Sequence, residues 1–232
     1  MKLTFFSGLC DGIPICLGYI VVSMSFGMLA VAQNIPISIA IALSMTNMTS
    51  AGQFAAVNLA GTFASYAEIG VATLVINIRY ALMSLVLSQK IEKMPFFKRM
   101  IIAFGITDEI FTLASTRSEK VNFRYMSGLI VTPYIGWAMG TTLGATINSL
   151  LPKAIAAAMG ITLYGMFIAI VMPAAKEEKA VLITLIIAMF LSCVFRYAPY
   201  LSQLSSGWAV IIVTLVTAAL AATMVQIKEK NA

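Results

Sequence analysis

The sequence is a succession of apolar stretches, most of them long enough to cross a lipid bilayer as a helix. Hydrophobic residues make up 60% of the 232 residues and charged residues only 10%. About 20 apolar residues in a helix span the roughly 30 Å of bilayer hydrocarbon. The stretches cover residues 12–33, 36–63, 67–88, 99–115, 125–149, 154–173, 180–195 and 206–226. We therefore expect an all-α polytopic membrane protein with about six to eight transmembrane segments, forming one transmembrane domain over residues 1–232.

Two of these stretches are interrupted by small and polar residues. Thr49–Gln53 interrupts 36–63, and Gly105–Glu109 interrupts 99–115. Thr107 followed by two acids is typical of a helix start, with a hydroxyl cap and carboxylates on the first turn. Both stretches are predicted to be broken or re-entrant helices, around 49–53 and 105–109. The alternative is that each spans the membrane with a kink.

The basic residues gather in short loops, which indicates the orientation of the chain. One group follows the third stretch (Lys90, Lys93, Lys98, Arg99) and another follows the fourth (Arg117, Lys120, Arg124). Basic loops favour the cytoplasmic side, so both should be cytoplasmic. Both loops can lie on the cytoplasmic side if the fourth stretch enters the membrane and returns to the side it came from, and if the second stretch does the same from the opposite side. Both termini are then cytoplasmic, and the net charge of +6 indicates membrane topology rather than nucleic-acid binding.

Three charged residues lie inside apolar stretches and are the first candidates for a functional site. A charge at bilayer depth costs a few kcal/mol or more, so Arg79, Asp108 and Glu109 need partners or water. Adjacent carboxylates in a low dielectric cannot both ionise cheaply, which makes Asp108 and Glu109 candidates for proton coupling. The alternative is that Asp108 caps a half-helix and Glu109 points to the cytoplasm. Asp11 and Glu68 lie near stretch ends and are expected at the membrane interface.

The substrate-binding candidates are Gly52, Gln53, Asn77, Arg79 and Trp137. A helix that begins at Gly52 would offer backbone N–H groups and a positive dipole end to a carboxylate, with the Gln53 amide beside them. The alternative is a close-packed Gly-Ala helix crossing. Arg79 can bind a carboxylate through its fork or form a structural pair with Asp108 or Glu109. Trp137, with Tyr19 and Phe111, can form apolar walls.

Glycine and proline positions also suggest an internal repeat. Pro14, Gly18, Gly27 and Pro36 recur in order and at similar spacing as Pro133, Gly136, Gly144 and Pro152. Transporters are often built from such repeats. Because glycine is common in membrane helices, chance accounts for the pattern as well.

The chain contains no histidine, which argues against several kinds of site. The commonest metal ligand is missing, and so is the base of Ser-His and Cys-His centres. Every lysine lies near the end of a stretch, which argues against a Ser-Lys pair. We therefore predict no enzyme, no catalytic residue, no metal site and no cofactor. A channel or a structural subunit of a membrane complex remains as an alternative to a transporter.

Several short motifs, in order, resemble the AzlC family of branched-chain amino-acid exporters. They are Gly8-Leu-Cys-Asp-Gly12-Ile-Pro14, Ser50-Ala-Gly-Gln-Phe-Ala-Ala56, Val75-Ile-Asn77-Ile-Arg79, the Thr107-Asp108-Glu109 element and Trp137-x-x-Gly140-Thr141. The resemblance covers roughly residues 7–175. It departs from the family pattern at Tyr80, where the family commonly has histidine after the arginine.

The resemblance implies a function and a partner. It implies a secondary transporter that exports branched-chain and related apolar amino acids across the bacterial cytoplasmic (inner) membrane. It also implies that this chain is the large subunit of a two-component exporter, with a small membrane subunit of the AzlD type as its partner.

Overall fold

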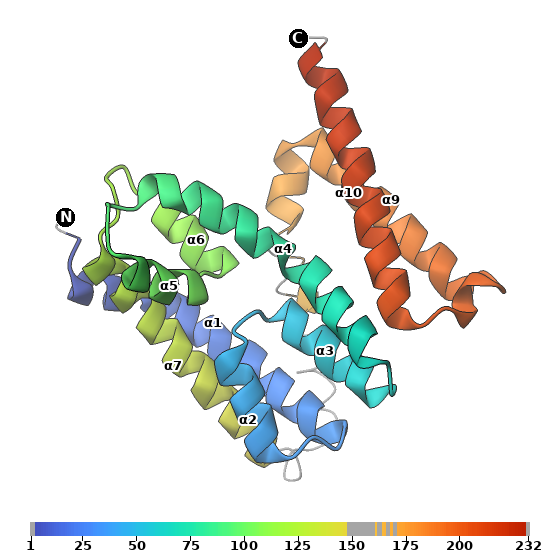
Figure 1. Cartoon of the computed structure of the whole chain (residues 1–232), viewed down its shortest axis with the longest axis horizontal. Helices are drawn as coiled ribbons and strands as arrows, with labels where there is room; N and C mark the ends of the chain where they lie inside the picture. Colours follow the sequence, from blue (N-terminus) through green and yellow to red (C-terminus); the bar gives the residue numbers. More distant parts are fainter. Residues whose placement is uncertain (1–2, 148–160, 162–163, 166–167, 169–170, 231–232) are drawn as a thin grey trace.

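The chain is all-helical (Figure 1). The computed structural model describes residues 3–147, 161, 164–165, 168 and 171–230, with side chains as far as Thr223. The helices with assigned bounds are α1 (Phe5–Ala32), α2 (Ile37–Thr46), α3 (Ala51–Gly61), α4 (Tyr66–Lys90), α5 (Phe96–Phe104), α6 (Asp108–Ser115), α7 (Phe123–Ile147), α9 (Lys179–Tyr197) and α10 (Ser206–Lys230), with a 3₁₀ turn at Leu201–Gln203. Residues 171–177 are also helical. The predicted stretch 154–173 lies mostly outside the described residues.

Helices α1 and α7 pack against each other along their length and run in the same direction (Figure 1). Gly8 near the start of α1 lies against the backbone of Tyr125 and Leu129 at the start of α7. Near the far ends of the helices, Gly144 lies against Met24 in the same way. Glycine lets the two backbones approach this closely because a Cβ would collide with the facing carbonyl. The suggested repeat stays a prediction, and its last member, Pro152, lies outside the described residues.

The stretch 36–63 is broken into α2 and α3, as predicted, but the break lies at 47–50 rather than 49–53. Residues 51–53 are already helical because α3 begins at Ala51. At the end of α3, Gly61 lies against the Gln33 side chain just after α1, so the chain returns to the end from which it entered. The α2–α3 hairpin is therefore re-entrant in shape.

Side chains of α7 hold the α2–α3 hairpin in place. Ser44 in α2 shares a buried hydrogen bond of 2.6 Å with Thr141, and the Tyr134 hydroxyl donates to the Met45 carbonyl at 3.1 Å.

The stretch 99–115 forms a second hairpin, which enters from the opposite end. Helix α5 runs inward to Gly105, which lies against Ile130 of α7, and α6 runs back. Thr107 caps α6 as predicted, accepting a hydrogen bond from the Ile110 N–H at 3.4 Å. After α6, Arg117 pairs with Asp11 near the start of α1. The fourth stretch is therefore broken and re-entrant in shape as well.

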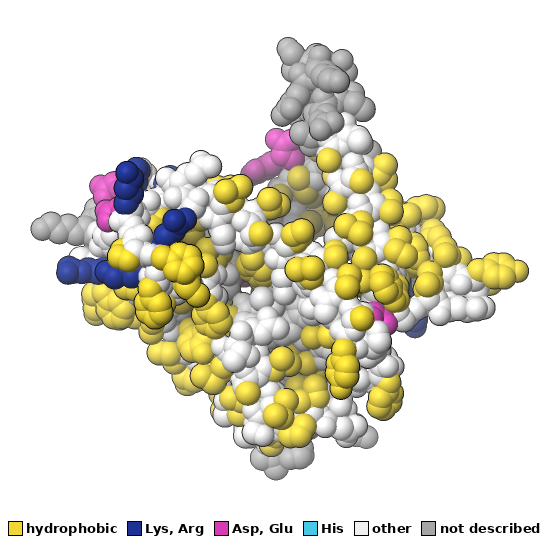
Figure 2. Space-filling model, in the orientation of Figure 1, with side chains coloured by type: hydrophobic (Ala, Val, Ile, Leu, Met, Phe, Trp, Pro, Cys, Tyr) yellow, Lys and Arg dark blue, Asp and Glu magenta, His cyan; other side chains and the backbone are white. Residues whose placement is uncertain are grey.

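These contacts define two ends of the helix bundle. The basic end holds the start of α1, the end of α4, the start of α7 and the loops of the second hairpin; an isolated bridge joins Ile91 to Val121 there. Its basic residues are Lys90, Lys93, Lys98, Arg99, Arg117, Lys120 and Arg124. Figure 2 shows lysine and arginine side chains gathered on that part of the visible face. The far end holds Gln33, Gly61 and the start of α4.

Helices α9 and α10 pack on each other, and α10 attaches them to α3 and α4 at the far end. Leu59, Ala72 and Ile211 form a small apolar cluster there. Ser205 donates a hydrogen bond to Glu68 in the first turn of α4, and Glu68 is only 5% exposed. The sequence placed Glu68 at the membrane interface and did not predict that α10 would cover it.

The outward surface of the molecule is apolar, as a bilayer requires. Helices α1, α4, α9 and α10 are long and apolar enough to cross a membrane. Helix α7, with 25 residues, has sufficient length but a more mixed composition. Leu74, Ile78, Leu82 and Leu85 are all more than 60% exposed along one face of α4. An exposed stripe of large apolar side chains fits contact with lipid.

Candidate functional site

The two hairpin breaks meet in the middle of the bundle, beside α1, α4 and α7. A small cavity of about 10 Å³ lies between these five elements. It is lined by Tyr19, Met48, Ser50, Tyr80, Thr107, Asp108, Glu109 and Trp137. Tyr19, Tyr80 and Trp137 each lie ten or more residues from both ends of their helices, which is about 15 Å or more. The cavity therefore lies near the middle of the helices. Its polar lining comes from parts of the chain that are distant in sequence.

Arg79 and Asp108 form an ion pair at one side of the cavity. The Arg79 Nη1–Asp108 Oδ2 distance is 2.6 Å, and both side chains are about one-third exposed or less. Arg79 also donates to the Tyr80 hydroxyl at 3.3 Å and lies over the Tyr80 ring. The Tyr80 hydroxyl in turn donates to the Thr49 carbonyl in the first break, at 3.2 Å. The ion pair and its neighbours therefore connect α4 to both breaks. Pairing with Asp108 is one of the two roles that the sequence analysis gave to Arg79.

Glu109 is held differently from Asp108. Its Oε2 accepts a hydrogen bond of 2.6 Å from the Tyr19 hydroxyl. The Tyr19 ring packs edge-on against Trp137 with ring centroids 5.0 Å apart. No ion pair of Glu109 occurs among the described residues. The two adjacent carboxylates thus have distinct surroundings, one beside a guanidinium and the other beside a phenol.

Three other predicted residues carry buried polar atoms that have no hydrogen-bond partner among the described residues. They are both amide atoms of Gln53, Oδ1 of Asn77 and Nε1 of Trp137. The Asn77 amide lies against Gly52, where a Cβ would be 2.5 Å from Asn77 Nδ2. Leaving a buried polar atom unpaired costs about 1–3 kcal/mol, so such atoms call for a ligand or water.

The backbone at the first break is strained beside the cavity. Ser50, which lines the cavity, has φ 45°, a value that side-chain-bearing residues rarely adopt. Strain of this kind costs about 1–3 kcal/mol and is found mainly at binding and switch regions.

The structure places the predicted site residues in two neighbouring groups. Arg79, Asp108, Glu109 and Trp137 surround or border the central cavity. Gly52, Gln53 and Asn77 lie at the start of α3 and on the facing part of α4. Phe111 packs against the main hydrophobic core and is not among the residues that line the cavity.

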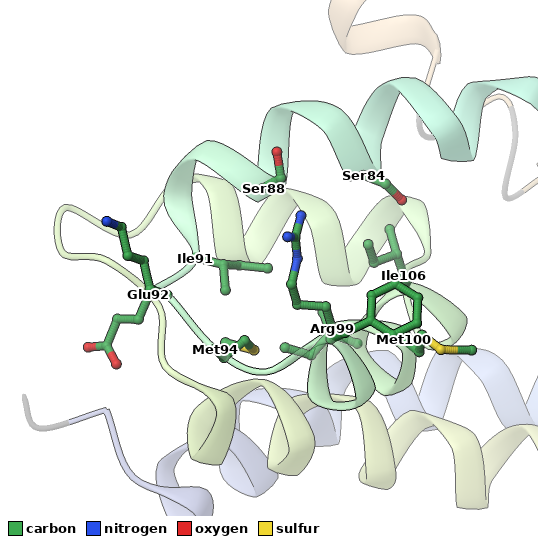
Figure 3. Close-up of a pocket in the computed structure, with 12 residues that line it drawn as sticks. Ser84, Ser88, Ile91, Glu92, Met94, Arg99, Met100 and Ile106 are labelled. Carbon is green, nitrogen blue, oxygen red and sulfur yellow. The ribbon is translucent and has the colours of Figure 1, made fainter.

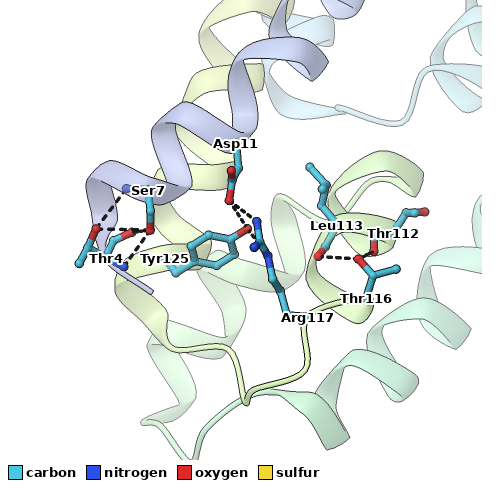
Figure 4. A network of polar contacts seen from close by, with 8 residues as sticks. All are labelled: Thr4, Ser7, Asp11, Thr112, Leu113, Thr116, Arg117 and Tyr125. Carbon is cyan, nitrogen blue, oxygen red and sulfur yellow. Dashed lines mark hydrogen bonds and ion pairs between the residues drawn. The ribbon is translucent and has the colours of Figure 1, made fainter. Parts of the chain in front are cut away.

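Sequence reasoning missed a second polar cluster, at the basic end (Figure 4). The Asp11 carboxylate accepts hydrogen bonds from Arg117 and from the Tyr125 hydroxyl, the latter at 2.8 Å. Arg117 Nε also donates to the Tyr125 hydroxyl at 3.1 Å. Asp11 was expected at an interface, but nothing in the sequence linked it to a residue more than 100 positions away.

Comparison with known proteins places the chain in one family. The sequence model described as AzlC protein matches residues 14–151. An uncharacterized membrane protein of Archaeoglobus fulgidus is 29% identical over 175 residues, 74% of this chain and 76% of the relative. Inner membrane protein YgaZ of Escherichia coli K12 is 26% identical over 189 residues, 78% of this chain and 77% of YgaZ.

The match extends to a third relative, an uncharacterized membrane protein of Helicobacter pylori. It is 28% identical over 142 residues, 59% of this chain and 61% of the relative. No solved structure matches significantly. The family match covers more than half of the sequence, spans both breaks and includes every residue of the central cavity, so this multi-pass membrane protein belongs to the AzlC family.

Proposed function

We propose that this protein is a secondary transporter that exports branched-chain or related apolar amino acids from the bacterial cytoplasm. It works by alternating access as the large subunit of a two-component exporter, with a small AzlD-type membrane subunit. The basic end faces the cytoplasm, following the positive-inside rule, and both termini lie on that side.

One observation supports this proposal above all others. Two broken hairpins enter from opposite ends and bring polar groups together halfway along the helices. Irregular backbone at membrane depth is tolerated only inside protein or beside a water cavity. In secondary transporters, breaks of this kind form the substrate site near the bilayer midplane.

The site has complementary groups for an apolar amino acid. The start of α3, with Gln53, offers donors to the carboxylate. Arg79 offers a second contact when it exchanges Asp108 for the substrate carboxylate. Glu109 accepts the ammonium group, and Tyr19, Met48 and Trp137 surround the side chain. The cavity, at about 10 Å³, is far below the 300–1,000 Å³ usual for ligand pockets, so the site is closed around the space that a substrate would fill.

Proton coupling is assigned to Glu109 rather than to Asp108. Asp108 is already engaged by Arg79, whose Nη1 lies 2.6 Å from Asp108 Oδ2. Glu109 is held by the neutral Tyr19 hydroxyl and has no cation beside it among the described residues. A group that takes up a proton on one side and releases it on the other needs this freedom.

Efflux of loaded leucine from bacterial cells tests the proposal. The protein is expressed alone, with an AzlD-type partner, and as Asp108→Asn with the partner. We expect efflux only with the partner, and its loss in the variant while the complex still assembles, because Arg79 is then left as an unpaired charge. No efflux with the partner for leucine, valine, isoleucine or methionine would contradict the exporter assignment and favour a channel or a structural subunit.

A further inference from the structure

A second and larger cavity lies between the end of α4 and α5, on the side of the central site that faces the basic end (Figure 3). Its volume is about 450 Å³, against about 10 Å³ for the central cavity. Ser84 and Ser88 line it from α4, while Arg99, Met100 and Ile106 line it from α5 and the turn that follows.

This α4–α5 cavity extends from the basic end to the edge of the central site. Glu92 and Lys93 line its outer part, in the loop at the basic end. Ile106 lines its inner part, and the next residue, Thr107, lines the central cavity. The turn between α5 and α6 therefore separates the two cavities, and a movement of that turn would join them.

The lining of the α4–α5 cavity combines two cations, Lys93 at the outer part and Arg99 on α5, with apolar walls. Figure 3 shows the Arg99 side chain reaching across the cavity toward α4, while the Glu92 carboxylate points away from it. Arg99 makes no ion pair with any described residue. Ile91, Met94 and Met100 provide apolar surface around it. A guanidinium binds carboxylates through two parallel hydrogen bonds, and the walls suit a branched aliphatic side chain.

We propose that the α4–α5 cavity is a vestibule that binds the transported amino acid on the cytoplasmic side before the α5–α6 turn moves. Arg99 holds the carboxylate and the apolar walls hold the side chain. This inference rests on the proposed function and adds a first binding step at a separate site. Because the vestibule reaches the basic end and the far end lies on the other side of the central site, its residues govern apparent affinity from the cytoplasmic side and not from the other.

Side-specific kinetics test the vestibule. Leucine uptake is measured in inverted vesicles, which expose the cytoplasmic side, and in right-side-out vesicles, each with the AzlD-type partner. We expect Arg99→Gln to raise KM about tenfold in inverted vesicles and to leave the KM of right-side-out vesicles unchanged. Arg99→Lys should lie between, because it keeps the charge without the fork. Equal changes in both vesicle types, or none in either, would overturn the inference.

Protection from labelling tests the same site without transport. Ser88→Cys is placed in a protein whose Cys10, Cys16 and Cys193 are replaced by serine, with Lys120→Cys as a control outside the cavity. Leucine should slow maleimide labelling at position 88 and leave position 120 unaffected. Absence of protection at 88 would overturn the vestibule. So would an Arg99→Gln defect that follows the anionic lipid content of the vesicles, because it would indicate a lipid headgroup site.

The two assays separate this inference from the proposed function. If wild-type vesicles show no leucine transport, the proposed function fails, whereas labelling still reports binding in the α4–α5 cavity. If the wild type transports leucine normally, Arg99→Gln has no effect and leucine gives no protection at position 88, the vestibule is rejected and the proposed function stands.

Discussion

Arg79 is the residue on which the central site depends most. It contacts Asp108 in the second break and Tyr80, which donates to Thr49 in the first break. The contacts of one guanidinium, directly and through Tyr80, therefore depend on the positions of both hairpins. A substrate carboxylate that competes with Asp108 for Arg79 would loosen α6 from α4, which couples binding to movement of the hairpin.

Gly52 is predicted to be required because its missing side chain makes room for Asn77. A Cβ at position 52 would be 2.5–2.8 Å from the Asn77 amide and Thr49 Oγ1. We expect Gly52→Ala to displace Asn77 and lower leucine efflux about tenfold or more at equal protein level. Gly70→Ala is the matched control, since a Cβ there meets nothing within 4 Å. Equal efflux in the two variants would show that the contact has no role.

The sequence predicted the local features of the site better than its pairings. The Thr107 cap depends on neighbouring residues and was predicted correctly. Arg79 was expected either to bind the substrate carboxylate or to pair with Asp108 or Glu109; the structure shows the pair with Asp108, and substrate binding stays a prediction. The hydrogen bond from Tyr19 to Glu109 joins residues 90 positions apart, so it depends on how α1 is rotated against α6. No sequence pattern fixes that rotation.

At the level of elements, both hairpins were predicted, with the bounds of their breaks placed to within three residues. Glycine, threonine and paired acids end or begin helices by local chemistry, which explains this success. The predicted break at 49–53 is wrong at its end because Gly52 and Gln53, which interrupt the apolar pattern, are already helical. Ser50 has the unusual backbone angle, and α3 begins at the next residue.

The Asp11–Arg117–Tyr125 cluster is predicted to fasten the returning end of the second hairpin to α1 and α7. Asp11→Asn removes the charge that both partners contact. We expect a loss of about 1–2 kcal/mol of stability, seen as a fall of about 2–8 °C in Tm in detergent. Arg117→Gln should cost a similar amount, and the double variant less than the sum of the two. Fully additive losses would show that the two residues act independently.

At the level of the whole molecule, the positive-inside argument and the two hairpins point to the same topology. The basic loops after α4 and α6 lie at one end because α5–α6 returns to it. The loop between α3 and α4 lies at the other end because α2–α3 returns there. Charge and hydropathy predicted this arrangement because both are properties of the chain alone. They gave no indication of the α4–α5 cavity, which requires side-chain positions.

This topology predicts which loops an impermeant reagent reaches in intact cells. In a background without native cysteines, Thr62→Cys at the far end should be labelled by a membrane-impermeant maleimide. Lys120→Cys at the basic end should be labelled only after permeabilisation. Both side chains are exposed, so burial does not prevent either reaction. Labelling of position 120 in intact cells would reverse or overturn the topology.

Leucine transport by Glu109→Gln, in proteoliposomes with the AzlD-type partner, tests most directly whether the central cluster couples transport to protons. The amide keeps the size of the side chain and a hydrogen-bonding atom for Tyr19, but it cannot carry a proton. We predict that leucine–leucine exchange continues with a raised KM, because the amide oxygen still accepts from the ammonium group but carries no charge, while accumulation driven by a pH gradient is lost. Unchanged gradient-driven accumulation, or loss of exchange in a correctly assembled complex, would contradict the account.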